Sequence, residues 1–290
     1  GQFNTDELDW QIDAAERAGK RIILCVGPLK TFSYPEFFVP LHQLGQPFPE
    51  HTLIKPSAYP SLLTAATEFI ARLVERYKHR RGIVAWQVEH EAVDPLGVEH
   101  SWRLAASFVE KEVEALRKAD PTRPVMMNGF LPTSLPVRLS QWWRTRDQGD
   151  SLAVAQHLAD IVGIDYYPRH ALMTAGTRTL YLDGSKLPWQ QQRGKRLFAQ
   201  THAHGQKLMI AEGQAEPWEA VTTPPNPPGQ GMYSCLPEQV IINYNTCMRW
   251  SQEEAPLYAY LFWGAEYWML RKQSADPRYL QTFARILENA

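Results

Sequence analysis

Residues 82–91 read Gly-Ile-Val-Ala-Trp-Gln-Val-Glu-His-Glu, and this stretch decides the fold. Its first part, residues 83–88, is an apolar run that follows a glycine and is too short for a helix, so it predicts a buried strand. Alternation along a strand places Gln87, Glu89 and Glu91 on one face, with Glu91 at the carboxyl end. Polar residues at the carboxyl end of a buried strand are typical of an α/β protein that builds its site there.

The same unit, an amphipathic helix followed by a turn and a short apolar strand, recurs along the chain. Strands are expected at residues 21–26, 83–88, 124–127, 161–164, 208–211 and 257–262. Helices are expected around residues 8–19, 62–77, 104–116, 152–159, 193–204, 240–248 and 280–287. This alternation predicts a parallel sheet with helices outside it. The first strand is not followed by Gly-x-Gly-x-x-Gly and there is no P-loop, which argues against a nucleotide-binding doubly wound sheet.

The length of the chain fits one catalytic barrel. A single (β/α)₈ barrel takes about 250 residues, and the 290 residues are expected to form one domain over positions 1–290. Four long segments that follow strands are rich in Pro, Gly and aromatic residues, and are expected to be ordered functional loops: residues 31–60, 131–150, 168–188 and 213–236.

Composition narrows the class of partner. The 30 basic and 31 acidic residues give a net charge of −1, and no Lys/Arg run is present, so neither nucleic acid nor a membrane surface is expected to bind. No apolar run approaches the roughly 20 residues of a membrane span. Three scattered cysteines suggest no disulfide framework, no signal peptide is recognisable at Gly1, and the compartment stays open. Ten Trp and twelve Tyr suit the apolar faces of sugar rings, although packing explains such residues equally well.

Two glutamates stand at corresponding strand ends. Glu91 follows one strand, and Glu212 ends another within Met-Ile-Ala-Glu-Gly, residues 209–213. They are 121 residues apart, which corresponds to three βα units of roughly 40 residues. A closed barrel would bring both carboxyl groups to its mouth, and a separation of about 5–5.5 Å selects retaining glycoside cleavage.

Four segments together resemble the active-site strands of clan A glycoside hydrolases. Residues 86–91, Trp-Gln-Val-Glu-His-Glu, look like the Trp-x-Val-x-Asn-Glu segment of that clan, and residues 211–218, Ala-Glu-Gly-Gln-Ala-Glu-Pro-Trp, are similar to its nucleophile strand. Residues 160–168, Asp-Ile-Val-Gly-Ile-Asp-Tyr-Tyr-Pro, and residues 262–264, Phe-Trp-Gly, resemble its sixth and eighth strands. The resemblance covers nearly the whole chain, and family 5, with its cellulases and mannanases, is the nearest family.

The resemblance implies a retaining β-glycoside hydrolase that acts on a β-linked oligo- or polysaccharide by double displacement, without a cofactor. It assigns Glu91 as the acid/base and Glu212 as the nucleophile. Tyr167 corresponds to the tyrosine that hydrogen-bonds the nucleophile, and Trp263 to the tryptophan that floors the sugar subsite.

Three further residues are candidate substrate contacts. His90 stands where the clan has the asparagine that contacts the sugar 2-hydroxyl; an imidazole can donate the same hydrogen bond, with a charge that depends on pH. Trp218 and Trp268 serve either as subsite walls or as packing residues. Glu216 and Glu266 are open between binding substrate hydroxyls and structural hydrogen bonds.

Two other classes of function stay open. A non-catalytic carbohydrate-binding barrel, or an inactive fragment, would keep the aromatic residues and tolerate the loss of either glutamate. A metal-dependent barrel hydrolase would need ligands at several strand ends, where only His90 qualifies. His202 and His204 lie at a helix end, where positions i and i+2 point in different directions, so no metal site is predicted.

The strand count predicts an incomplete barrel. If the glutamates mark the fourth and seventh strands, then residues 21–26 form the third strand, and the first two strands are expected to be missing. The apolar edges of residues 21–26 and 257–262 would then be exposed. Exposed edges pair readily with another chain, which predicts a homodimer across the gap, aggregation, or a rearrangement that closes a smaller barrel.

Overall fold

The computed structural model describes residues 4–30, 39, 44, 46–94, 101–175, 178–217 and 234–288. The chain divides into two compact units, which are described separately below: residues 1–129 with 144–161, and residues 130–143 with 162–290. Across the described residues, no helix is both long and apolar enough to cross a membrane.

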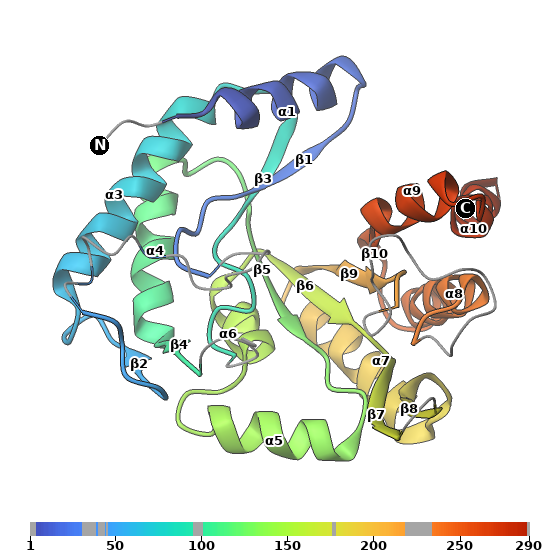
Figure 1. The fold of residues 1–290 in the computed structure, drawn as a ribbon. Coiled ribbons are helices and arrows are strands. Elements are labelled where there is room, and N and C mark those ends of the chain that lie inside the picture. Colours follow the sequence, from blue (N-terminus) through green and yellow to red (C-terminus); the bar gives the residue numbers. More distant parts are fainter. Residues whose placement is uncertain are drawn as a thin grey trace. The chain divides into compact units, whose positions relative to one another are not determined.

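The main sheet contains the six expected strands, in the order β1-β3-β5-β6-β9-β10. Their bounds are β1 (Ile22–Cys25), β3 (Ile83–Gln87), β5 (Val125–Phe130), β6 (Ile161–Tyr166), β9 (Lys207–Gln214) and β10 (Leu257–Trp263). The strands are parallel and their order follows the sequence, so each helical crossover leads to the adjacent strand (Figure 1). The predicted fold class, an α/β fold of the (β/α)₈-barrel type with six βα units, is therefore confirmed.

The first unit contains the helices α1 (Asp6–Arg17), α3 (Pro60–Tyr77), α4 (Ala106–Ala119) and α6 (Ser151–Leu158), and the short pair β2 (Leu53–Ile54) and β4 (Arg103–Leu104). Helix α3 begins at Pro60, whose missing N–H costs nothing in the first turn. Helices α3 and α4 lie side by side (Figure 1). Asp9 of α1 accepts hydrogen bonds from Tyr77 at 2.6 Å and from Arg76 at 2.5 Å, and so joins α1 to α3.

The second unit contains two elements within segments that were expected to be loops. Helix α5 (Leu135–Thr145) follows β5, and an antiparallel hairpin of β7 (Arg169–Ala175) and β8 (Arg178–Asp183) follows β6. The remaining elements are the 3₁₀ turn η1 (Gly184–Lys186) and the helices α7 (Pro188–Ala203), α8 (Pro237–Glu253), α9 (Ala265–Gln273) and α10 (Arg278–Glu288). Proline and glycine near these segments obscured their periodicity, because both residues also mark turns.

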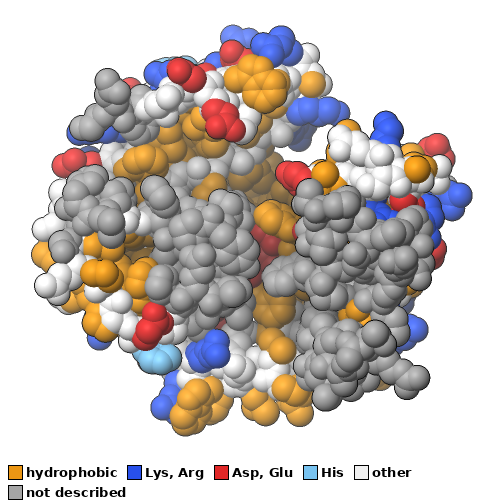
Figure 2. Space-filling view, viewed as in Figure 1, with side chains coloured by type: hydrophobic (Ala, Val, Ile, Leu, Met, Phe, Trp, Pro, Cys, Tyr) orange, Lys and Arg blue, Asp and Glu red, His pale blue; other side chains and the backbone are white. Residues whose placement is uncertain are grey.

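Helix α5 leaves apolar side chains exposed. Leu135, Leu139, Trp142 and Trp143 are between 55% and 59% exposed, and the two indole rings lie 6.4 Å apart. Figure 2 shows hydrophobic side chains gathered at the lower edge of the view, where α5 lies in Figure 1. This apolar face was not predicted, since the segment was expected to be a loop without helical periodicity.

Candidate active site

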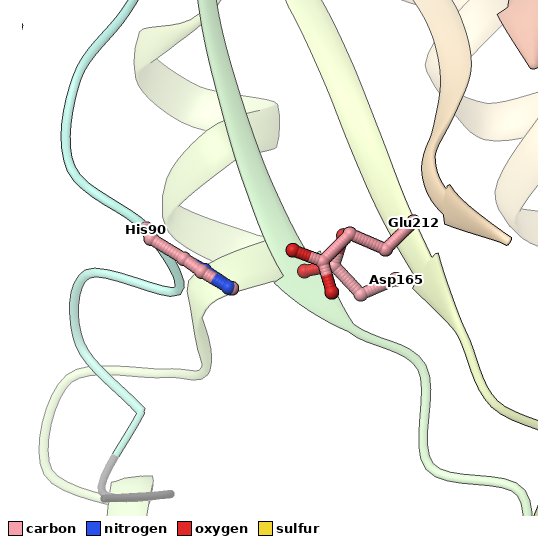
Figure 3. Close-up of side chains that lie close together, drawn as sticks. All are labelled: His90, Asp165 and Glu212. Atoms are coloured by element: carbon pink, nitrogen blue, oxygen red, sulfur yellow. The ribbon is translucent and has the colours of Figure 1, made fainter. Parts of the chain in front are cut away.

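Glu212 lies within β9 of the second unit, and its carboxyl group is almost completely buried. The side chain is 5% exposed, and the Tyr167 hydroxyl, which follows β6, donates to Glu212 Oε2 at 2.7 Å. The hydrogen bond expected between these two residues is therefore present. Carboxylate oxygens of Glu212 and Asp165 lie within 4.8 Å of one another. Figure 3 shows Glu212 and Asp165 projecting from β9 and β6; His90, in the same view, belongs to the first unit.

The backbone at Gly213, next to Glu212, lies close to the Tyr260 ring of β10. Gly213 follows Glu212, and a Cβ atom at that position would lie 2.4 Å from the Tyr260 ring of β10. Tyr260 Cα is in register with Ile210 of β9. A larger residue at position 213 would have to displace the Tyr260 ring, so glycine keeps the end of β9 close to β10.

The environment of Glu212 favours its protonated form. Burial raises the pKa of Glu212 to about 7; the hydrogen bond from Tyr167 opposes that increase, and the negative charge of Glu216 adds to it. A carboxylate nucleophile must be ionised. The Tyr167 hydroxyl thus supports the ionised form, and its removal would raise the pKa of Glu212 further.

Trp263, at the end of β10, is in contact with Glu216. Burial and the charge of Glu266 raise the pKa of Glu216 to about 6, and a hydrogen bond with the Trp263 side chain opposes that increase. Trp263 is half-buried, so part of its ring remains accessible in the described structure. The function of Trp263 as a subsite floor stays a prediction, and Glu216 is engaged in a structural hydrogen bond.

Trp268, the next candidate tryptophan, packs inside the second unit. Trp268 is 4% exposed, its indole N–H donates to the Ala215 carbonyl at 2.8 Å, and its ring packs against Phe262 and Phe283. These contacts favour the packing alternative for Trp268. Trp218 lies outside the described residues.

Glu91 lies in the first unit, beyond the end of its strand. Strand β3 ends at Gln87, and both Glu89 (φ 56°) and Glu91 (φ 44°) have left-handed backbone conformations. The alternation expected for Gln87, Glu89 and Glu91 therefore does not apply, because the strand geometry stops before the two glutamates. Glu91 is half-buried, and its backbone N–H donates to Asn128 Oδ1 of β5 at 3.3 Å.

Glu89 is fully buried and joins the ends of β1 and β3. Its carboxylate accepts hydrogen bonds from the backbone N–H groups of Leu29, at 3.1 and 3.2 Å, and of Lys30, at 2.5 Å. A Cβ atom at position 27 would lie 2.2 Å from the Glu89 backbone nitrogen, so the close approach requires Gly27. Burial raises the pKa of Glu89 to about 7, while hydrogen bonds with Glu112, Lys30 and Leu29 oppose that increase. Glu89 therefore makes a structural contact between the segments that follow β1 and β3.

His90 is neutral in the environment that the structure gives it. Burial, with a contribution from the positive charge of Lys30, lowers the pKa of His90 to about 3. Both ring nitrogens are shielded from solvent, and the backbone N–H donates to the Lys30 carbonyl at 3.2 Å. A charge that varies with pH in the neutral range is therefore not expected at this position. Contact between His90 and a sugar hydroxyl stays a prediction.

Sequence comparison identifies no relative of this chain: no protein-family model and no curated protein matches it. Structural comparison finds glycoside hydrolases of clan A. A Thermobacillus composti GH10 xylanase has a TM-score of 0.52 and 13% identity over 90% of this chain and 70% of its own. β-Glucuronidases of Dictyoglomus thermophilum and Ruminococcus gnavus each have a TM-score of 0.50, with 14% and 12% identity over 88% of this chain.

The likeness to these enzymes concerns the fold. The chain spans 36% and 35% of the length of the two glucuronidases, and identities this low carry no residue-level information. The fold resembles that of these glycoside hydrolases, whereas the finer likeness to family 5 finds no support among these neighbours.

Sequence reasoning missed two residues that hold Glu91. Asn128 was expected only to terminate a strand, yet its side chain accepts hydrogen bonds from both Gln87 and Glu91. Lys30, which follows the Gly27-Pro28 turn, was not singled out, although it is only 2% exposed. A lysine after a strand end is usually solvated, so its burial has no signal in the sequence.

Proposed function

We propose that the chain is a retaining β-glycoside hydrolase that acts on a β-linked oligo- or polysaccharide by double displacement. The observation that carries the proposal is the buried Glu212 carboxylate at a barrel-strand end, with the Tyr167 hydroxyl 2.7 Å from it. Such a carboxylate is shielded from water, and one hydrogen bond orients it. The likeness to the fold of a xylanase and two glucuronidases supports the proposal at the level of fold.

The two proposed steps assign a separate task to each glutamate. In the first, ionised Glu212 attacks the anomeric carbon as the bond to the leaving oxygen breaks, and protonated Glu91 transfers its proton to that oxygen. In the second, the Glu91 carboxylate takes a proton from water, the water oxygen bonds to the anomeric carbon, and Glu212 is released. The mechanism requires the carboxyl groups to stand about 5–5.5 Å apart, which stays a prediction.

The names of the structural neighbours make xylosides and glucuronides the first substrates to try, and the resemblance to family 5 adds glucosides and mannosides. His90, Trp263 and Trp218 are the proposed substrate contacts. No metal or other cofactor is part of the proposal.

A panel of aryl β-glycosides tests the proposal: xyloside, glucuronide, glucoside, mannoside and galactoside. Hydrolysis of at least one, with the β-anomer as the first product in proton NMR, is the expected result. Formation of the α-anomer first would rule out the retaining mechanism. Binding of oligosaccharides without hydrolysis of any panel member would instead favour a carbohydrate-binding barrel.

A further inference from the structure

The turn that carries Glu91 is in a conformation that requires support. Glu89 and Glu91 both have positive φ values, and neither is a glycine. For a residue with a Cβ atom, the left-handed region is unfavourable, because Cβ approaches the following carbonyl oxygen. Two such residues within three positions persist only where surrounding contacts hold the backbone in place.

The buried side chain of Lys30 supplies such contacts in the first unit. Its ammonium group donates to the Glu91 carbonyl oxygen at 2.5 Å and to the Asp94 carbonyl oxygen at 2.6 Å. The side chain is 2% exposed, so the charge is removed from water and depends on these partners. Asn128 binds the N–H of Glu91, so both backbone polar groups of Glu91 are held.

Further contacts position Lys30 and hold the carboxyl-terminal part of the turn, Val93 and Asp94. Glu89 accepts the Lys30 backbone N–H, while the Lys30 carbonyl accepts the N–H of His90. Ser151 Oγ accepts the N–H groups of Val93 at 3.1 Å and Asp94 at 3.2 Å, and Ser151 N–H donates to Asp94 Oδ1 at 3.1 Å. The segment from Glu89 to Asp94 is thus attached at both ends, with the Lys30 ammonium group between them.

We infer that Lys30 is a positioning residue for Glu91: its ammonium group fixes the turn that holds the Glu91 carboxyl group where the leaving oxygen is protonated. The inference rests on the proposed function, since it assigns Lys30 to the acid/base step. A positioning role differs from a purely structural role in its effect on catalysis. If the Glu91 carboxyl group is misplaced, only the steps in which Glu91 transfers a proton become slower.

The test compares Lys30→Met with Arg123→Met. Lys30→Met keeps the length of the side chain and removes its charge and donors. Arg123 is the matched control, because it is also a cation that donates to carbonyl oxygens of the first unit, those of Ile83 and Arg80, but at the other end of β3. Both variants are expected to lose stability; only Lys30→Met is expected to alter the dependence of the rate on the leaving group.

For Lys30→Met, kcat/KM is expected to fall on the order of 10²-fold for alkyl or unactivated phenyl glycosides, since misplacement by about 1 Å has an effect of that size. The dinitrophenolate group leaves without protonation, so a dinitrophenyl glycoside should keep its rate of glycosylation within about threefold of the wild-type rate. Proton transfer accelerates the reaction by about 10²–10⁴-fold only for leaving groups that have to be protonated. Arg123→Met should lower both rates equally or not at all. Circular dichroism establishes that each variant is folded, and Lys30→Gln replaces Lys30→Met if that variant does not fold.

The outcomes separate the inference from the proposed function. An active wild type in which the lysine variant and Arg123→Met show the same leaving-group dependence overturns the inference and leaves the proposed function intact. A wild type that hydrolyses no glycoside overturns the proposed function, and the inference falls with it. Selective loss on unactivated substrates, together with faster amide exchange over residues 88–94, supports the inference.

Discussion

Glu91 and Glu212 are assigned to one reaction, yet the backbone holds them in different ways. Glu212 lies within β9, in extended geometry that continues to Gln214, and its side chain accepts a hydrogen bond from the Tyr167 hydroxyl. Glu91 lies four residues beyond β3, in a left-handed turn that is held by Lys30 and Asn128. A strand fixes the direction of a side chain by its own periodicity, whereas a turn requires contacts from distant parts of the sequence.

The largest effect is expected for the residue within the strand. Glu212→Ala removes the proposed nucleophile, and kcat should fall on the order of 10⁴-fold or more for every glycoside, irrespective of the leaving group. Steady-state kinetics on the aryl glycoside panel measure the loss. A variant that keeps more than a hundredth of the wild-type rate would contradict the assignment of Glu212.

A smaller and selective effect is expected for the residue in the turn. Glu91→Ala removes the proton donor, so kcat/KM should fall by about 10²–10⁴-fold for poor leaving groups and little for a dinitrophenyl glycoside. Azide, which needs no general base, should then restore turnover of the activated substrate and yield a β-glycosyl azide. If azide has no effect and both glutamate variants keep equal residual rates, the two roles are wrongly assigned.

Tyr167→Phe tests how far the orientation of Glu212 depends on one hydroxyl. Loss of a hydrogen bond to a charged group costs about 1.5–3 kcal/mol, which corresponds to roughly 1–2 units of pKa. Because Tyr167 lowers the pKa of Glu212, which is raised to about 7, the variant should move that pKa upward. The nucleophile is active when ionised, so the acid limb of the kcat/KM profile should shift to higher pH. If the acid limb does not shift, it reports the ionisation of a group other than Glu212.

The smallest effect on activity is expected at Glu112 of α4, which is fully buried beside Glu89. Burial and the charge of Glu89 raise the pKa of Glu112 well above its ordinary value, and two neighbouring buried carboxyl groups favour a state in which one of them keeps its proton. Since both folded-state pKa values are raised, the unfolding free energy should decrease as the pH rises above about 4.5 and through 7.

Glu112→Gln should remove the part of this pH dependence that the Glu89–Glu112 pair contributes, because the amide can donate a hydrogen bond to ionised Glu89 without a shared proton. The variant is expected to be more stable than the wild type by about 1–3 kcal/mol at pH 8 and to match it near pH 5, with unchanged kcat. Urea unfolding at the two pH values measures both quantities. Equal stability of the two proteins at pH 8 would show that no shared proton is present.

The sequence predicted the strands of the main sheet well, because local patterns determine them. The six predicted strands lie within three residues of their expected bounds, and β9 extends past Glu212, which was expected to follow it, to Gln214. The partner of Glu212, Tyr167, was implied by the resemblance to clan A and not by the local pattern, and its hydroxyl donates to Glu212. A short apolar run and its flanking residues suffice to predict the strands alone.

The parts that sequence reasoning missed depend on contacts between distant residues. The turn after β3 is set by Lys30, 61 positions before Glu91, and by Asn128, 37 positions after it. Trp268 was left open between a subsite and the core, and the core is favoured by its burial and by contacts with distant residues, such as the hydrogen bond to Ala215, 53 positions away. No local pattern distinguishes a buried lysine from a solvated one, or a packed tryptophan from an exposed one.

The bare Cα of Gly27 limits which sequences can occupy this part of the fold. Every other amino acid would place a carbon atom 2.2 Å from the Glu89 backbone, whatever its polarity or size. A saturation library over residues 25–30 should therefore return one solution at position 27 and several at its neighbours. An engineer who wishes to redesign the loop after β1 has to keep this glycine fixed, or move the turn after β3 together with it.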